Sequence, residues 1–292
     1  MNFVASEAYS AVWQGWDSVC GGGLYWNIKD KTLALGDKPT QVNVQQMLVA
    51  AQLTAATNNQ SYIKNADLTL QWLKSSGVLA SNGTLYYGVR PSENCDVFNV
   101  VNNRDSGLLL GALGWMYKVT KQQSYIQDAS LILNQLLKSS TMNGVFVDSC
   151  EPTCKLSNTS PKGALIRGLG YLYEFTPDEA QKQLIKDTLT KSVQAMVKVC
   201  DDEWNCGNFW ESGQQAASKS VHDQMNAAEL MTAYYKTFGV SAKMGLAPPA
   251  GSRNASADGV VGSTPDLKPN GASGLASLVA LPFTIFSMAL LA

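Results

Sequence analysis

Apolar residues recur at intervals of three and four positions through most of the first 240 residues, which is the spacing of one face of an α-helix. The pattern predicts eight helices, near residues 3–18, 42–57, 62–75, 106–119, 125–138, 161–175, 179–199 and 221–238. Patterns typical of strands are confined to short segments at 23–26, 85–87 and 144–147, each between two predicted helices. The chain is therefore predicted to be all-α.

An internal repeat relates two of these helices. The sequence Gln-Ser-Tyr-Ile at residues 60–63 returns at residues 123–126, so Tyr62 corresponds to Tyr125 and the period is 63 residues. The repeating unit is a helical hairpin with a long loop, and such units bury their apolar faces only against neighbours. We expect an α/α toroid, a ring of antiparallel helix pairs of the (α/α)6-barrel type, incomplete because six hairpins require twelve helices. Solenoids of tetratricopeptide repeats are the alternative, but their period is much shorter.

The chain ends in an uncharged apolar segment, residues 275–292. Small residues from Asn270 onward precede it, and a polar stretch rich in Ser, Gly, Asp and Pro precedes those. This order is typical of the signal that is exchanged for a glycosylphosphatidylinositol (GPI) anchor. We expect attachment at Asn270, with 262–263 as the alternative. A tail-anchored membrane helix is less expected, because it needs about 20 apolar residues and basic flanks.

These patterns divide the chain into three parts. Residues 1–240 form the toroid domain, residues 241–270 a disordered linker rich in Ser, Gly and Pro, and residues 271–292 the anchor signal. Residues 1–18 contain neither a basic region nor an apolar core of a signal peptide. Because an anchored protein must enter the secretory pathway, we expect further residues before Met1 and an extracellular location at the cell surface or wall.

Six cysteines agree with an oxidising compartment, where an even number favours disulfides. The expected pairs are Cys150 with Cys154, Cys200 with Cys206, and Cys20 with Cys95, although the sequence alone does not fix this connectivity. Zinc is not expected, because His222 is the only histidine and no Cys-x-x-Cys spacing occurs. Four glycosylation sequons point to the same compartment, at Asn59, Asn82, Asn158 and Asn254.

Charge narrows the possible partners. A net charge of −1 and a pI near 5.9 give no electrostatic basis for binding nucleic acid or an anionic membrane surface. No phosphate-binding Gly-Lys-Ser/Thr sequence follows the triple glycine at 21–23, and no cofactor is expected.

Two loops have the composition of a sugar-binding surface. The glycine loop, residues 20–26, combines three glycines with Tyr25 and Trp26, and residues 206–210 end in Phe209 and Trp210. Glycines allow a ligand to approach the backbone closely, and aromatic rings offer apolar faces that match the C–H face of a sugar. We expect Tyr25, Trp26 and Trp210 to contact substrate, although packing of the loops alone explains any single ring equally well.

The motifs follow one another in the order seen in glycoside hydrolase family seventy-six, which the chain resembles over most of residues 4–239. The matching residues are Trp16, Cys20–Trp26, Gly107–Ala112, Lys162 and Gly163 with Arg167, Cys206 and Gly207 with Trp210, and Gln224 and Met225 with Glu229. The resemblance implies an endo-acting α-1,6-mannanase, and its fungal members include GPI-anchored proteins that help to attach other GPI proteins to the cell wall.

The family's catalytic pattern is where the chain departs from this resemblance. Members carry an adjacent Asp-Asp pair on a helix before the glycine loop, as nucleophile and acid/base, whereas only Asp17 is acidic and close here. The sole adjacent pair, Asp201 and Asp202, lies far beyond the expected place, and a solvated loop is the favoured interpretation of it. The family's Tyr-Asn ahead of the helix at 107 is Arg104-Asp105 here. Ser-His-Asp chemistry through His222 is not favoured, since no Gly-x-Ser-x-Gly occurs.

The sequence therefore predicts a glycosidase or transglycosidase acting on α-1,6-linked mannose of mannan or a GPI glycan, with the Asp-Asp pair missing from these residues. A non-catalytic mannan-binding or wall-structural protein is the alternative from another class, and an unrelated helical-repeat scaffold is a third. Lys162 and Arg167 are interpreted as structural. Whether hydrolysis or transfer dominates, and the oligomeric state, stay open.

Overall fold

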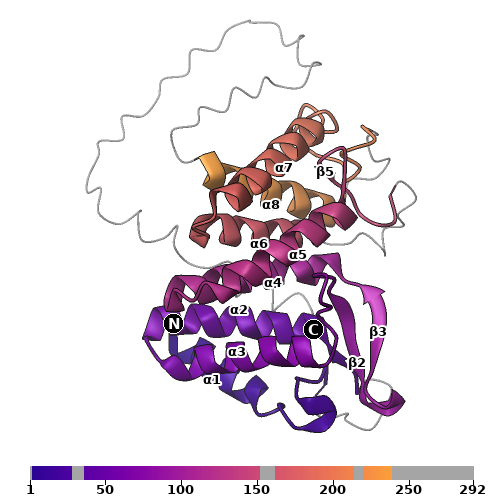
Figure 1. Cartoon of the computed structure of the whole chain (residues 1–292). Coiled ribbons are helices and arrows are strands. Elements are labelled where there is room, and N and C mark those ends of the chain that lie inside the picture. Colours follow the sequence, from indigo (N-terminus) through magenta and orange to yellow (C-terminus); the bar gives the residue numbers. More distant parts are fainter. Residues whose placement is uncertain (1, 28–35, 152–161, 214–219, 239–292) are drawn as a thin grey trace, which may run out of the picture. The chain divides into compact units, whose positions relative to one another are not determined.

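The computed structural model describes residues 2–27, 36–151, 162–213 and 220–238, all within one unit that spans Met1–Ser252 (Figure 1). Within these ranges the chain forms eight α-helices, as the periodicity predicts. They are α1 (Asn2–Trp13), α2 (Thr40–Thr57), α3 (Gln60–Ser75), α4 (Asn103–Thr120), α5 (Ser124–Ser140), α6 (Lys162–Phe175), α7 (Glu179–Val197) and α8 (Val221–Phe238). The expected linker, anchor signal, Asn158, Asn254, Asn270 and Cys154 lie outside the described residues.

Four helices, α2, α4, α6 and α8, lie side by side in one row, in which α4 packs between α2 and α6, and α6 between α4 and α8 (Figure 1). We call these the inner helices, and α1, α3, α5 and α7 the outer helices. Neighbours in the row are parallel, because Gly107 of α4 faces Leu165 of α6 while Gly114, two turns on, faces Leu172. An outer helix connects each inner helix to the next. The row of hairpins is the arrangement predicted for the toroid.

The 63-residue period appears as repeated contacts between inner helices. Arg104 of α4 donates to Gln41 of α2, and Asn226 of α8 accepts from the backbone N–H of Gly163 of α6, each pair 63 positions apart. The repeat itself begins the outer helices α3 and α5, where the hydroxyl of Tyr125 donates to Asp67 Oδ1 at 3.0 Å. The sequence repeat therefore marks equivalent hairpins.

Small residues allow α4 and α6 to pack with their backbones in contact. A Cβ atom on Gly107 or Gly168 would overlap backbone atoms of the other helix, and one on Gly111 would lie 3.0 Å from the Cα of Gly168. Glycine in a helix interior costs about 1 kcal/mol relative to alanine. The close packing of buried leucines on both helices, including Leu109 and Leu169, offsets this cost.

Two small sheets precede inner helices. Strands β1 (Lys38–Pro39), β2 (Tyr86–Arg90) and β3 (Asp96–Val101) form an antiparallel sheet in the order β1-β2-β3, and β4 (Thr141–Met142) pairs with β5 (Val145–Phe146). In the register, Val89 lies opposite both Lys38 and Val97. The patterns at 85–87 and 144–147 thus coincide with strands, whereas 23–26 is not a strand, because the preceding glycines have positive φ values.

Helix ends differ from the predicted ones where a side chain caps the backbone. Helix α4 begins at Asn103 rather than near 106, because the Asn102 side chain accepts a hydrogen bond from the N–H of Asp105. Helix α1 ends at Trp13, five residues early, and the chain turns there into Trp16 and the glycine loop. Asn59, one of the predicted glycosylation sites, is exposed and caps α3.

Candidate functional site

The loops that precede the inner helices gather at one end of the row, because the inner helices are parallel. They comprise residues 14–27 and 36–39 before α2, the β2–β3 hairpin before α4, residues 141–151 before α6 and residues 198–213 before α8. Both aromatic loops singled out in the sequence belong to this end. The candidate site therefore comprises these loops and the first turns of the helices that follow them.

The glycine loop is organised around a buried lysine. Lys38 is completely buried, and its ammonium group donates to Asp17 Oδ1 and to the carbonyl oxygens of Val19 and Gly22, each at 2.7 Å. The ring of Tyr25 lies over the same ammonium group, 4.5 Å from Nζ to the ring centroid. Burial, followed by the nearby charge of Asp17, raises the pKa of Tyr25 to about 12. This phenol therefore stays protonated at neutral pH.

Two of the three glycines are required by the packing of Trp72. Gly22 and Gly23 have φ values of +140° and +90°, and a Cβ on Gly23 would lie 2.5 Å from the Trp72 ring. The indole N–H of Trp72 donates to the Cys20 carbonyl, and Cys20 forms the predicted disulfide with Cys95. Contacts with Lys38 and Trp72 and the disulfide to Cys95 thus fix the part of the loop that precedes Trp26.

Of the three predicted sugar contacts, the structure leaves one ring open. Trp26 is 47% exposed, and its backbone N–H donates to the Asp37 carbonyl. Tyr25 is buried beneath its loop, and Trp210 is 1% exposed, with its indole N–H donating to the Gly207 carbonyl. Both rings are packed within their loops in this structure, and their contact with a sugar stays a prediction.

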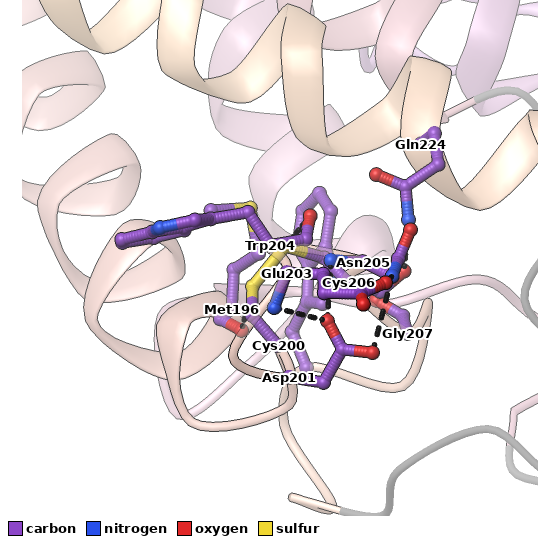
Figure 2. Close-up of a disulfide and its surroundings, with 10 residues drawn as sticks. Met196, Cys200, Asp201, Glu203, Trp204, Asn205, Cys206, Gly207 and Gln224 are labelled. Carbon is purple, nitrogen blue, oxygen red and sulfur yellow. Dashed lines mark hydrogen bonds between the residues drawn. A yellow bond between two sulfur atoms is a disulfide. The ribbon is translucent and has the colours of Figure 1, made fainter. Parts of the chain in front are cut away.

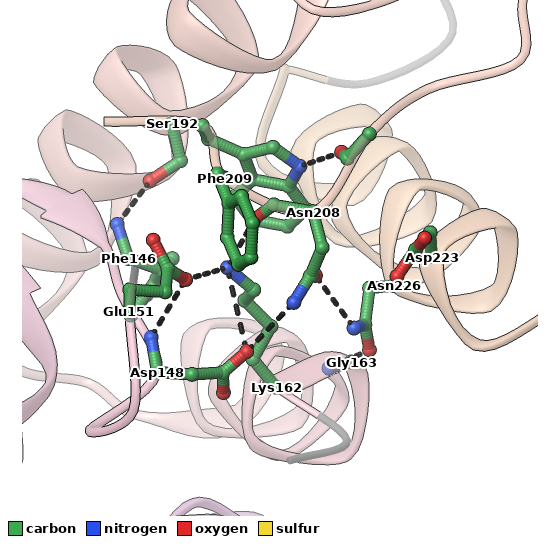
Figure 3. A network of polar contacts seen from close by, with 12 residues as sticks. Phe146, Asp148, Glu151, Lys162, Gly163, Ser192, Asn208, Phe209, Asp223 and Asn226 are labelled. Carbon is green, nitrogen blue, oxygen red and sulfur yellow. Dashed lines mark hydrogen bonds and ion pairs between the residues drawn. The ribbon is translucent and has the colours of Figure 1, made fainter. Parts of the chain in front are cut away.

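A second buried lysine joins the loops before α6 and α8 (Figure 3). The Lys162 ammonium donates to Glu151 Oε1 at 2.6 Å and to the Asn208 carbonyl at 2.7 Å, and it lies 3.7 Å from Asp148 Oδ2 and 4.3 Å from the Trp210 ring centroid. Burial raises the pKa of Glu151 above its usual value, while Lys162 opposes the shift. These contacts agree with the structural interpretation of Lys162.

Amide side chains extend this network into α8. Asn208 donates to Asp148 Oδ2 at 2.9 Å and accepts from Asn226, which in turn accepts from the N–H of Gly163 at 2.8 Å (Figure 3). Asp223, at the start of α8, is also buried. One of its carboxylate oxygens accepts from the backbone N–H of Ser220, and the other, Oδ1, has no hydrogen-bond partner among the described residues.

Two arginines cross-link neighbouring inner helices. Arg104 donates to both carboxylate oxygens of buried Asp105, at 2.8 and 3.1 Å, and to Gln41 of α2 at 2.7 Å. Arg167 of α6 forms an ion pair with Glu229 of α8. The Arg104-Asp105 pair noted in the sequence thus forms an internal salt bridge at the start of α4. The ion pair of Arg167 agrees with its interpretation as a structural residue.

The loop at residues 200–206 is closed by the predicted disulfide between Cys200 and Cys206 (Figure 2). Asp201 Oδ1 accepts from the backbone N–H groups of Glu203 and Asn205, and Oδ2 accepts from the Asn205 amide. The Asp201 carboxylate therefore shapes the turn, while Asp202 is exposed. These contacts agree with a solvated structural loop rather than with a catalytic pair.

The carboxylates at this end are largely engaged in contacts within the protein. Among the described residues, Asp17, Asp105, Glu151 and Glu229 each pair with a lysine or arginine. Glycoside hydrolysis with retention needs one ionised and one protonated carboxyl about 5–5.5 Å apart. Asp148 and Glu151 are neighbours, but both are buried around Lys162. Sequence reasoning missed this cluster, whose members come from separate loops.

The remaining predictions concern cysteines, metals and membranes. Cys150 is disulfide-bonded, but its predicted partner Cys154 lies outside the described residues. Within the described part of the chain, no cluster of three or more His, Cys, Asp or Glu residues suits a metal ion. No helix in the same ranges is long and apolar enough to span a bilayer.

The family assignment rests on a match over nearly the whole described region. The model of glycosyl hydrolase family 76 matches residues 3–241. The chain belongs to this family. Among curated relatives, it is 26% identical to mannan endo-1,6-alpha-mannosidase DFG5 of Saccharomyces cerevisiae over 78% of this chain and 52% of that protein. It is also 26% identical to the DCW1 enzyme of Candida glabrata, over 90% of this chain and 60% of that protein.

Solved structures show the same fold. Dfg5 from Chaetomium thermophilum, in complex with glucosamine, superposes with a TM-score of 0.72 at 24% identity, over 80% of this chain and 60% of that one. An inactive variant of an α-1,6-mannanase of Salegentibacter, with two consecutive aspartates replaced and α-1,6-mannotriose bound, gives 0.70 at 17% identity over 80% and 68%. The predicted α/α toroid class is confirmed. The chain spans about half the length of the curated relatives it matches.

Proposed function

We propose that the chain belongs to a glycosidase or transglycosidase that acts on α-1,6-linked mannose in fungal wall mannan or GPI glycans, and that its described residues bind the glycan. The family match over residues 3–241 carries this proposal. Trp26 supports it locally, because an exposed indole on a loop held by Lys38, Trp72 and a disulfide is suited to stacking on a sugar ring.

The catalytic part of the proposal follows from the paired carboxylates. Four acids at this end, Asp17, Asp105, Glu151 and Glu229, already pair with a lysine or arginine, so the described loops support binding better than they support a catalytic pair of carboxyls. Loss of a general acid alone costs about 10² to 10⁴ in rate. We therefore expect the 292-residue chain to bind α-1,6-mannooligosaccharides without cleaving them.

Calorimetry with α-1,6-mannotetraose, combined with chromatography of the incubated sugar, tests both statements. Binding that is weakened in Trp26→Ala, with intact tetraose, is the expected result. Absence of binding would overturn the proposal. Cleavage would contradict its catalytic part and direct attention to Asp201 and Asp202, whose replacement by Asn should otherwise leave binding unchanged.

The alternative is that the chain belongs to a non-catalytic mannan-binding or wall-structural protein. The ion pairs between the acids and lysine or arginine favour this alternative. The two functions differ in one measurement. If a longer form of the protein that carries an Asp-Asp helix ahead of the glycine loop cleaves mannan, the enzyme is supported; a form without such a pair that only binds supports the alternative.

The location is part of the same proposal. The apolar segment 275–292 and the small residues at Asn270 support exchange for a GPI anchor, and two disulfides among the described residues suit an extracellular protein. Recovery of an intact C-terminal peptide from the mature protein would contradict the anchor.

A further inference from the structure

We infer that Trp204 is a second carbohydrate-stacking residue, and that it and Trp26 bind the two ends of one α-1,6-linked glycan segment. This inference rests on the proposed function and extends it. Chemically, the partner is a neutral oligosaccharide long enough to reach both rings, not a monosaccharide.

Exposure separates these two residues from the other tryptophans. Trp26 is 47% and Trp204 43% exposed, whereas each of the other five is buried or half-buried. The half-buried rings of Trp13 and Trp16 stack on each other, and Trp115 packs against Phe175. Trp26 and Trp204 are thus the two indoles, among the described residues, with a large area open to solvent.

The backbone of Trp204 is held in a conformation that is unfavourable for its side chain. Its φ value is +61°, which for a bulky residue costs about 1–2 kcal/mol. The turn persists because the disulfide closes residues 200–206 and Asp201 binds the backbone on both sides of Trp204. Backbone strain of this kind, sustained by surrounding contacts, clusters at ligand-binding sites.

The conformation has a visible consequence for the ring. Figure 2 shows the Trp204 indole extending away from the disulfide and the Asp201 turn. The neighbouring carboxylates of Asp202 and Glu203 are exposed, so they can accept hydrogen bonds from sugar hydroxyl groups beside the ring. An apolar face next to acceptor groups is the chemistry that recognises a hexose.

Position connects the two rings. Trp26 lies in the loop before α2 and Trp204 in the loop before α8, the first and last members of the parallel row. The 200–206 loop is fixed to the first turn of α8, because Gln224 donates to the Cys206 carbonyl. Packed helices lie about 8–10 Å apart, so three steps separate the loops by up to about 24–30 Å. One sugar unit cannot bridge this interval, but an oligosaccharide can.

The test measures how the length of the oligosaccharide and the residue at position 204 change the affinity of the 292-residue chain. Calorimetry should show that Trp204→Ala weakens binding of α-1,6-mannohexaose about tenfold, because tryptophan is among the residues whose truncation costs most at a binding surface. Binding of α-1,6-mannobiose at Trp26 should be unchanged. Trp204→Phe, which keeps a stacking face, should restore most of the affinity. The matched control is Tyr235→Ala, which removes an equally exposed ring (43%) from the body of α8 and should change neither affinity.

Several outcomes overturn the inference. The inference is wrong if Trp204→Ala and the wild type bind the hexaose with equal affinity. It is also wrong if Tyr235→Ala loses as much hexaose affinity as Trp204→Ala. If Trp204→Ala does not fold, the indole N–H resonance of Trp204 in the wild-type protein replaces it, and a resonance unmoved by saturating hexaose contradicts the inference. A wild type that binds no α-1,6-mannooligosaccharide refutes the proposed function itself, whereas hexaose binding that depends on Trp26 alone refutes only the role of Trp204.

Discussion

Lys38 and Lys162 stabilise their loops through the same set of contacts. Each buried ammonium group donates to a carboxylate and lies against an aromatic ring. Each also donates to the carbonyl oxygen of a residue two positions after a disulfide-bonded cysteine. This residue is Gly22 for Lys38 and Asn208 for Lys162. A buried charge is tolerated only where such partners replace water. Each lysine therefore fixes the position of an aromatic loop that local sequence alone does not determine.

Removal of Lys162 should be strongly destabilising. Lys162→Met leaves Asp148 and Glu151 buried without their cation, and breaking a buried ion pair costs about 3–5 kcal/mol. Urea unfolding followed by circular dichroism measures this loss. Lys64→Met, at an exposed position of α3, should change the free energy of unfolding by no more than about 0.5 kcal/mol. A loss below about 1 kcal/mol in Lys162→Met would show that the acids relax into solvent.

Glu151 should make stability depend on pH. Burial raises its folded-state pKa above the ordinary value of 4.5, so between these two pKa values the folded state binds more protons than the unfolded state. This contribution to stability is complete below pH 4.5 and is lost as the pH rises through the folded-state pKa. Urea midpoints measured from pH 4 upward should show this component in the wild type and not in Glu151→Gln. Parallel curves for the two proteins would contradict the assignment.

At the scale of elements, the contact between α4 and α6 determines how closely the row packs. Glycines on both helices replace side chains with backbone-to-backbone contact, so a single methyl group has no space there. Overpacking of this kind costs about 1–3 kcal/mol. We therefore expect a methyl group added at this α4–α6 contact, the seam of the row, to destabilise the protein more than one added at the other contacts between inner helices.

Two alanine substitutions on one helix test this. Gly168→Ala should lower the free energy of unfolding by at least about 1–3 kcal/mol, because its new Cβ meets the backbone of α4. Gly170→Ala places its Cβ 3.4 Å from Ala233, an ordinary contact, and should be neutral or stabilising by up to about 1 kcal/mol. Chemical denaturation of both variants is the measurement, and equal effects would refute the proposed seam.

The helices were predictable because the local sequence pattern determines them. Helical periodicity gave all eight described helices, and the repeat at Tyr62 and Tyr125 gave their grouping into hairpins. The loops were not predictable, because their conformations depend on distant partners. Lys162, for example, binds a carbonyl 46 positions away. A lysine at the start of an apolar helix was the available signal, since it requires buried counter-charges, but the sequence did not say which acids supply them.

At the scale of the whole described unit, the disulfide between Cys20 and Cys95 connects the glycine loop to the β2–β3 hairpin across 75 residues. It therefore couples the loop that carries Trp26 to the region before α4. The disulfide between Cys200 and Cys206 spans only 6 residues and shapes a local turn. The first disulfide therefore constrains two distant segments, whereas the second constrains only one turn.

Removal of the long bridge should have the larger effect on stability. Chain entropy predicts that replacing Cys20 and Cys95 by Ser costs about 4 kcal/mol, and less for the six-residue bridge. Thermal unfolding of the two double variants compares them. The Cys20/Cys95 variant should also lose affinity for mannooligosaccharides at Trp26, and a larger destabilisation in the Cys200/Cys206 variant would contradict the argument.

The parallel direction of the inner helices has an electrostatic consequence. Each helix carries about half a positive charge at its N-terminus, so four macrodipoles point their positive ends toward the loops of the candidate site. Asp105 and Asp223 lie in the first turns of α4 and α8, close to these positive ends. A carboxylate in the first turn of a helix offsets part of this potential, so the loops of the candidate site meet a weaker positive field than four helix ends without such acids would produce.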